Sequence, residues 1–415
     1  MEKLTFTIDG YSFSTAFNTA AKREQCAEKI LSTTGRHYSW YKENTGNKNW
    51  ILYDTEQYEV RNFDDIKYLV LNNRLMDVKT FLCVRRDFKG KLHLPINAST
   101  CSFMFVDSNV PEIDLTEFDT TNVVDMDYMF LEANLGDCLS LVSSTITQAN
   151  TPDRNILTLN TEGVISMSGM FKDCKVKHLD LRNLRTDNVT DFSDMFCSCN
   201  DLIDLNVDGF DTSKAKDFHG IFQGCIKLTQ LNVKHFNVDN VLHMSCLFSR
   251  CLRLKVINLE SWDFSQVSDA NEMFAYCEKL EKIIANFNFK MIKEMAFMFC
   301  YCTKLSKVDL SHSDLSHVFD FGYAFFKCEG LKEIRFSPGV WRKAKYTLSM
   351  FDNCKALERL NLPDVVLDDV VRSYAMFDDC DSLKEIYMEH PLNLEKYAHG
   401  LIFGNCKAEV KKSTE

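Results

Sequence analysis

Apolar residues recur along most of this chain with a spacing of 25 or 26 residues. Each recurrence centres on a phenylalanine that directly follows another apolar residue, and in ten units a cysteine comes three residues after the phenylalanine. Self-similarity at one fixed period predicts a repeat architecture. The phenylalanines of the twelve units are Phe105, Phe130, Phe171, Phe196, Phe222, Phe248, Phe274, Phe299, Phe325, Phe351, Phe377 and Phe403.

Each unit combines two kinds of apolar spacing. Leu254, Ile257 and Leu259 follow one repeat cysteine, and the alternation of the last two predicts a short strand. Val241 and Met244 precede the phenylalanine of the same unit at helical spacing, which predicts a helical or 3₁₀ return. Stacked units of this kind bury a continuous core and place parallel strands along one face.

The repeats divide the chain into three parts. Residues 1–90 lack the repeat and are expected to form a small α+β domain that caps the apolar edge of the first unit. Residues 91–406 form the array, with an insertion at about 131–155 that lengthens one unit, and 407–415 form a polar tail. The elements expected in the first part are strands at 4–8, 50–53 and 78–84 and helices at 20–31 and 64–71.

Composition indicates a folded chain in a reducing compartment. Of 415 residues 45% are hydrophobic, with only 15 Gly and 6 Pro, which excludes a disordered or fibrous protein. No apolar run is long enough to span a bilayer, and the first residues show no signal core, so we expect no membrane contact. An odd number of cysteines, 17, favours free thiols and a cytoplasmic location.

The charge is unevenly distributed. The net charge is −11, but residues 1–95 carry 15 basic and 12 acidic side chains, so the remainder carries 33 basic and 47 acidic ones. An acidic array disfavours direct binding of nucleic acid and favours a protein partner with a basic surface. In the first part, the segment 36–42 mixes basic and aromatic residues, which suits either stacking on single-stranded nucleic acid or, more commonly, core aromatics on a strand.

The repeat resembles a known family. Residues 205–248, LNVDGFDTSKAKDFHGIFQGCIKLTQLNVKHFNVDNVLHMSCLF, are similar to the 26-residue version of the BspA-like leucine-rich repeats of bacterial and mycoplasma surface proteins. The unit at 115–130, LTEFDTTNVVDMDYMF, matches most closely, and the resemblance covers about residues 92–406. It implies a leucine-rich-repeat solenoid with a protein-binding or adhesive role.

The sequence contains few features that indicate a metal site or a catalytic site. A ladder of ten cysteines at one repeat position lays its sulfurs in a row, whereas zinc needs four converging ligands, so the cysteines are interpreted as core residues. The chain contains no HExxH, GxSxG or phosphate-loop motif. We therefore expect no metal, no cofactor and no enzyme activity.

Candidate contact residues lie where the repeat pattern is broken. One outward residue stands between the inward residues of each strand, and most members of this row are Asn or Asp: Asp114, Asp180, Asn206, Asn232, Asn258, Ile284, Asp309, Arg335, Asn361 and Tyr387. The variable members Ile284, Arg335 and Tyr387 are the better candidates for contacts. A basic, aromatic cluster with Trp341, Arg342 and Tyr346 also departs from its unit and is a candidate hot spot or a local loop change.

These observations predict a non-enzymatic leucine-rich-repeat module that binds a protein through its strand face. An acidic array also suits an inhibitor that blocks the basic groove of a nucleic-acid-binding protein such as a host defence nuclease. A bacterial surface adhesin, as the resemblance implies, and a cysteine-dependent enzyme are the remaining alternatives. Loss of binding at raised salt would favour the inhibitor over an adaptor with an apolar contact.

Overall fold

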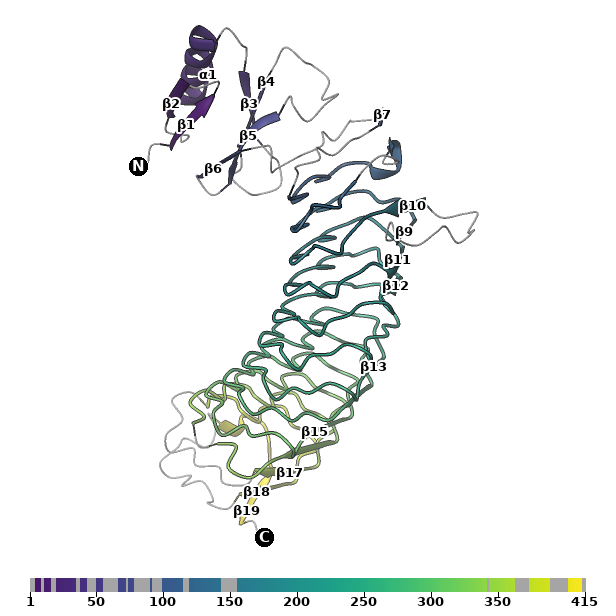
Figure 1. Cartoon of the computed structure of the whole chain (residues 1–415). Coiled ribbons are helices and arrows are strands. Elements are labelled where there is room, and N and C mark those ends of the chain that lie inside the picture. The colour runs from purple at the N-terminus through teal and green to yellow at the C-terminus, as the bar shows by residue number, and fades with distance from the viewer. Residues whose placement is uncertain are drawn as a thin grey trace.

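The structure is a computed structural model of the chain. It describes residues 4–8, 11–15, 20–34, 38–42, 50–54, 66–71, 74–77, 90–91, 99–114, 119–142, 155–341, 343–362, 373–388 and 402–412. Figure 1 shows the repeat region as a curved stack of coils, each carrying its strand on the same side. Strands of neighbouring coils pair in parallel. The predicted leucine-rich-repeat solenoid is confirmed.

The strands of the solenoid are short, and most coils carry one. They are β7 (Gly90–Lys91), β8 (Ile113–Asp114), β9 (Cys138–Val142), β10 (Asn155–Thr158), β11 (His178–Asn183), β12 (Asp204–Asn206), β13 (Val256–Leu259), β14 (Lys282–Ala285), β15 (Lys307–Leu310), β16 (Glu333–Phe336), β17 (Arg359–Leu362), β18 (Glu385–Met388) and β19 (Glu409–Lys412). A 3₁₀ turn at Val110–Glu112 precedes β8. In β13, Ile257 and Leu259 are buried and Val256 is exposed, as the predicted alternation requires.

The chain before the repeats contains a helix and two small antiparallel sheets. Its elements are β1 (Leu4–Ile8), β2 (Tyr11–Thr15), α1 (Ala20–Thr34), β3 (Tyr38–Lys42), β4 (Trp50–Asp54), β5 (Ile66–Leu71) and β6 (Arg74–Asp77). The strands expected at 4–8 and 50–53 and the helix at 20–31 agree with β1, β4 and α1. The aromatic segment 36–42 contributes β3, which pairs with β4. The capping role of this region stays a prediction.

One element of this region was assigned wrongly. The helix expected at 64–71 is strand β5, which pairs with β4 on one side and β6 on the other. Its sequence IKYLVL is rich in β-branched and aromatic residues, and pairing across two neighbours outweighs the short helical spacing. The strand expected at 78–84 lies outside the described residues.

In the coils around Phe274 and Phe299 the return segment consists of turns and is not a helix, so the expected helical or 3₁₀ return is wrong there. The N–H groups of Phe297, Phe299 and Tyr301 donate to carbonyls of the next coil at 2.8–2.9 Å. The intervening N–H groups of Met298 and Cys300 donate to carbonyls three residues earlier in their own coil. The helical apolar spacing therefore reflects successive tight turns whose hydrogen bonds depend on a neighbouring coil.

This hydrogen-bond pattern requires left-handed backbone at two positions in each coil. Residues two before and two after the repeat phenylalanine have positive φ, for example Phe297 at 58° and Tyr301 at 59°. Among the residues that the structure describes, nineteen that are not glycine adopt such angles, each at a cost of about 1–2 kcal/mol. At Gly169, which has a φ of 57°, an added Cβ would also lie 2.3 Å from the ring of Tyr128 in the preceding coil. Hydrogen bonds between coils and burial of the core offset this strain.

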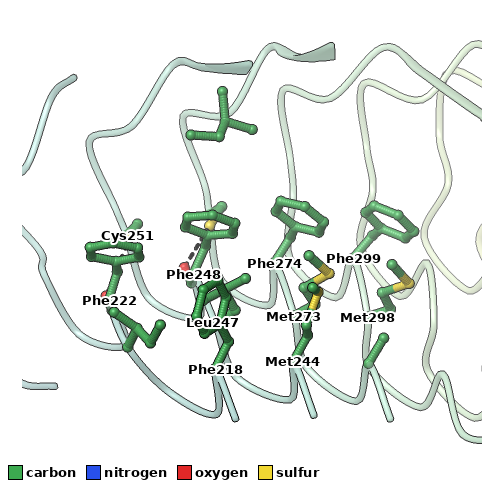
Figure 2. Close-up of a cluster of buried hydrophobic side chains, with 14 of the residues drawn as sticks. Phe218, Phe222, Met244, Leu247, Phe248, Cys251, Met273, Phe274, Met298 and Phe299 are labelled. Carbon is green, nitrogen blue, oxygen red and sulfur yellow. Dashed lines mark hydrogen bonds between the residues drawn. The ribbon is translucent and has the colours of Figure 1, made fainter. Parts of the chain in front are cut away.

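The repeat phenylalanines form one continuous ladder through the core. All twelve stack ring on ring, with centroids 5.2–5.8 Å apart between successive coils. Figure 2 shows Phe222, Phe248, Phe274 and Phe299 aligned in this way, beside Met273 and Met298. Each such ring pair contributes roughly 0.5–1.5 kcal/mol beyond the area it buries.

The repeat cysteines have a more specific role than filling space. The Sγ of Cys277 donates to the carbonyl of Phe248 at 3.1 Å, and Cys302 donates to Phe274 at the same distance. The same contact recurs from Cys174 to Cys380. Burial raises the pKa of Cys277 to about 12, so the thiol stays protonated and keeps its donor. All fifteen cysteines whose state is described are free, which agrees with the expected reduced ladder.

Two boundaries differ from those expected. The lengthened unit contributes an additional strand: β10 pairs with β9 on the side opposite β11, and residues 143–154 between them lie outside the described residues. The expected polar tail at 407–415 contains β19, which pairs in parallel with β18. A short polar segment carries no apolar alternation of its own, and the open edge of β18 supplies the hydrogen bonds that order it.

Replacing Phe274 by Ala is expected to lower the free energy of unfolding by about 3–5 kcal/mol, because the change leaves a cavity between two stacked rings. Hydrogen exchange should show lost protection in the neighbouring coils and much less effect in distant ones, since coils contact only their neighbours. The exposed Asn232→Ala is the control. Equal loss of protection along the whole array would contradict this local coupling.

Counting thiols in denaturant without reductant should give close to the full 17 cysteines of the sequence. Each described repeat cysteine is buried and spaced by one coil from the next, an arrangement that uses the thiol as a donor to a carbonyl. A reagent that titrates free thiols measures the number. A count of one to three would mean that the protein is stabilised by disulfides.

Candidate protein-binding surfaces

The Asn and Asp residues of the outward strand row have a structural role. The side-chain oxygens of Asn206, Asn258 and Asp309 each accept a hydrogen bond from the N–H two residues later, at 3.0–3.1 Å. Such side-chain turns hold the chain as it leaves the strand. These three polar members of the row therefore have a structural explanation that needs no partner.

The variable members of the row lie on β14, β16 and β18. Ile284 is half-buried and pairs in register with Asn258. Arg335 is exposed, and its guanidinium lies 2.7 Å from Glu333 and 3.8 Å from Asp309 of the adjacent strand. The structure thus brings the three predicted contact residues into one row, with one coil between successive members.

Tyr387 is the third of these residues and lies near the C-terminal end of the row. It is half-buried, and its hydroxyl donates to a carboxylate oxygen of Glu385 at 2.9 Å. The same carboxylate contacts Arg359 and Lys411 from the strands on either side. These ion pairs are largely exposed, so they hold side chains in place more than they stabilise the fold.

The expected exposure of Trp341 is wrong. Only 4% of this side chain is exposed, and its ring lies 5.1 Å from Phe321 and 5.5 Å from Phe336. Trp341 stands ten residues before the phenylalanine of its unit, where the two preceding units have the buried Leu315 and Phe289. Alignment of the units on their phenylalanines would therefore have predicted that Trp341 is buried in the core.

The other two members of that cluster are separated from it. Arg342 lies outside the described residues. Tyr346 is half-buried and forms a parallel bridge with Asp320. It therefore lies among the return segments, on the other side of the coil from the strand row.

Charge is divided between two faces of the solenoid. Strands β11 to β19 carry six acidic residues, Asp180, Asp204, Asp309, Glu333, Glu385 and Glu409. They also carry seven basic ones, Arg182, Lys282, Lys307, Arg335, Arg359, Lys411 and Lys412. Because several of these side chains pair across neighbouring strands, the strand face is close to electrically neutral.

The opposite face holds the acidity. We call the segments from five residues before to two residues after each repeat phenylalanine the turn face. Its described part, from Thr100 to Asp379, has three basic residues, Lys172, Arg250 and Lys327. It has fifteen acidic residues, Asp107, Asp125, Asp127, Glu132, Asp173, Asp191, Asp194, Asp217, Asp269, Glu272, Glu294, Asp320, Asp352, Asp378 and Asp379. A basic partner is therefore attracted to this face more than to the strands.

The turn face also carries aromatic residues that the pattern of the sequence did not single out. Tyr276, Phe297, Tyr301, Tyr323 and Phe326 are all half-buried and come from three consecutive coils. Elsewhere in the described array an aromatic pair at these repeat positions occurs at the start, where Phe103 and Tyr128 stack with centroids 5.0 Å apart. Aligning the units on their phenylalanines would have shown this local excess of aromatic side chains.

One histidine and one serine are paired on the turn face. His219 Nδ1 lies 2.7 Å from Ser245 Oγ, but within the described residues no carboxylate bonds to the other ring nitrogen. The pair therefore lacks the acid that orients the base in a nucleophilic relay. Among the same residues no three His, Cys, Asp or Glu side chains converge as a metal site. No helix described by the structure has the length and apolar character needed to cross a bilayer.

Comparison with known proteins identifies the family. Overlapping matches to the family described as Mycoplasma protein of unknown function, DUF285, together span residues 96–390. The matched region exceeds half of the chain, so this protein belongs to that family of repeat proteins. The resemblance to mycoplasma repeats is confirmed. No curated protein matches the chain.

Two solved structures are similar to this chain. A leucine-rich repeat protein from Eubacterium ventriosum shares 13% identity, with 74% of this chain and 72% of that chain covered and a TM-score of 0.34. A leucine rich cell surface protein from Faecalibacterium prausnitzii shares 13% identity, with coverage of 68% and 89% and a TM-score of 0.23. At these scores the description of the fold rests on the coordinates of this chain.

Asp127 is expected to make stability depend on pH. The pKa of this carboxyl is raised from 3.8 to about 6, mainly because the group is buried. Hydrogen bonds from Ser166 and Ser168 lower the pKa, and the nearby charges of Asp125 and Asp191 raise it. Between pH 4 and pH 6 the native state then binds more protons than the unfolded state, so stability falls as pH rises and stays lower above pH 6.

The variant Asp127→Asn keeps a side-chain oxygen that can accept the two hydrogen bonds but cannot ionise. Thermal unfolding between pH 4 and pH 7 should show a smaller decline for this variant than for the parent protein. The exposed Asp239→Asn is a matched control and should leave the slope unchanged. Parallel curves for the parent and Asp127→Asn would mean that Asp127 ionises normally.

Proposed function

We propose that this protein is a non-enzymatic binding module that contacts a protein partner through its strand face. The supporting observation is the change in chemistry along the outward row from β14 to β18. There Ile284, Arg335 and Tyr387 replace the Asn and Asp that hold the turns elsewhere. A row of identical polar residues does not define where along the array a partner binds. An aliphatic side chain, a guanidinium group and a phenol group at fixed intervals do define that position.

The strand face also has the form that protein recognition needs. It is continuous over many coils, and its charges are paired between neighbouring strands, as in Arg335 with Asp309 and Arg359 with Glu385. A partner that covers this face desolvates few uncompensated charges. We place the module in a reducing compartment, because its repeat cysteines act as thiol donors.

An inhibitor that occupies the basic groove of a nucleic-acid-binding protein is the second candidate. It is favoured by the fifteen acidic residues on the described part of the turn face. Such a complex would weaken steeply as salt is raised, because its affinity would come from many carboxylates on a face with only three described basic residues. A complex formed through the strand face would depend on salt much less, since the charges there are already paired.

The test begins with affinity capture from the source cell, identification of the bound protein and its purification. Arg335→Ala and Tyr387→Ala, made separately, should each weaken binding of the purified partner at least about tenfold, as loss of Arg and Tyr anchors does. Their thermal transitions should barely move, because both side chains lie on the surface.

Asn232→Ala on the same row is the matched control and should bind as the parent does. Binding should be compared at low and at raised salt. If all three variants bind equally well and raised salt alone abolishes the complex, the strand face is not the contact and the acidic inhibitor becomes the better description.

A further inference from the structure

We propose that the turn face carries a second docking surface, which binds a basic protein segment containing aliphatic residues. The surface is the aromatic patch formed by Tyr276, Phe297, Tyr301, Tyr323 and Phe326. The proposal rests on the proposed protein-binding role, but it uses the side of the coil opposite the strand row. Either surface can therefore fail without the other.

The patch is a stacked column rather than a scatter of rings. The Tyr276 and Tyr301 rings stack with centroids 4.9 Å apart, between Arg250 on one side and Lys327 on the other, both 4.9 Å from a ring centroid. The column therefore consists of a cation, two rings and a second cation, which come from four consecutive coils. Stacking of this kind orders the side chains before any partner arrives.

A second pair of rings widens the column into a patch. The rings of Phe297 and Tyr323 stack with their centroids 4.8 Å apart. Each stands two residues before the repeat phenylalanine of its coil, whereas Tyr276 and Tyr301 stand two residues after theirs. Phe326 joins the two columns, with its ring at 5.5 Å and steep angles to both Tyr301 and Tyr323. All five rings are half-buried, so each keeps an edge in contact with solvent.

The backbone at these positions argues against a purely structural role. Tyr276, Phe297, Tyr301 and Tyr323 all have φ between 56° and 61°, a conformation that disfavours bulky side chains. Equivalent positions in other coils hold Gly220, Gly224, Ser198 and Asn353, which tolerate it, but also Phe103 and Tyr128, which stack on each other at 5.0 Å. The core phenylalanine ladder runs equally well through coils without such aromatic residues. Four aromatic residues at strained positions in three consecutive coils are therefore a local feature that stacking of the coils does not require.

The geometry of the column decides which class of partner fits. Both faces of Tyr276 and Tyr301 are covered, by each other and by Arg250 and Lys327, so a nucleobase or sugar ring finds no free face to stack on at these two rings. What remains accessible are ring edges and hydroxyl groups. Aliphatic side chains of a protein suit this surface, and the acidic surroundings exclude a phosphate backbone.

Charge complementarity selects the basic character of the partner. Asp269, Glu294 and Asp320 come from the same three coils as the patch, one from each, and form a row joined by parallel bridges. Each accepts one hydrogen bond that anchors it, from Asn271 in the first two cases and from Gly322 in the third. Lys or Arg side chains can lay their aliphatic stems on the ring edges and place their charged groups at these carboxylates.

Synthetic peptides provide the probes. A peptide of alternating Lys and Leu should bind the protein at least about tenfold more tightly than one of alternating Lys and Ser, because only the first adds apolar contact to charge. A peptide of alternating Glu and Leu should not bind. Equal affinity for the Lys-Leu and Lys-Ser peptides, or no binding of either, would overturn the proposal.

The double variant Tyr276→Asn, Tyr301→Asn isolates the patch. Asn accepts left-handed backbone, so the thermal transition should stay in place or rise while affinity for the Lys-Leu peptide falls to that for the Lys-Ser peptide. Ser198→Asn, at the same repeat position outside the patch, is the matched control and should change neither. A lowered transition with undiminished binding would show that the rings are packing elements.

A charge variant covers the case in which the double variant fails to fold. Glu294→Gln with Asp320→Asn keeps the oxygens that accept the anchoring hydrogen bonds and removes two charges. It should weaken Lys-Leu binding and flatten its salt dependence without moving the thermal transition. Unchanged affinity and slope would overturn the proposal. Arg335→Ala on the strand face should leave peptide binding intact, which separates this test from that of the proposed function.

Discussion

Hydrogen bonding between coils is the constraint on which the rest of this structure depends. Alternate N–H groups of each return segment donate to the next coil, as Phe299 does to Ala324, and this geometry holds the residues two before and two after the phenylalanine at positive φ. No coil can adopt this conformation alone, because half of its donors would be unpaired. The stacked phenylalanine rings and the thiol hydrogen bonds of the cysteines also join each coil to its neighbours.

The same constraint produces two faces with different physical properties. On the strand side, residues alternate in and out, and opposite charges meet across neighbouring strands, as Lys307 meets Glu333. On the turn side, tight turns are stabilised by short acidic side chains that accept backbone N–H groups, as Asp269 does from Asn271. Carboxylates thus accumulate on one side for a local structural reason, and a basic partner would experience their combined field.

A residue that departs from the repeat consensus is informative only when it is compared with the residues at the same repeat position in other coils. Trp341 departs from the consensus in composition, yet it occupies a position that is buried in the two preceding coils, and it packs in the core. Tyr276 and Tyr301 occupy a position that the other described coils fill with small or polar residues, and both have positive φ. An aromatic residue therefore packs in the core at one repeat position and lies half-buried at the surface at another.

The sequence by itself determined the period, the stacked core, the free thiols and the strand row that holds Arg335 and Tyr387, because inward and outward positions follow from spacing within a single unit. Only the tertiary structure decided that the return is built of turns, that 409–412 is a strand and that Tyr276 stacks on Tyr301. Each of these depends on hydrogen bonds or ring contacts with residues about one coil away, or on the open edge of a neighbouring strand. Such contacts leave no trace in local hydrophobic spacing, which is the signal that a sequence carries most directly.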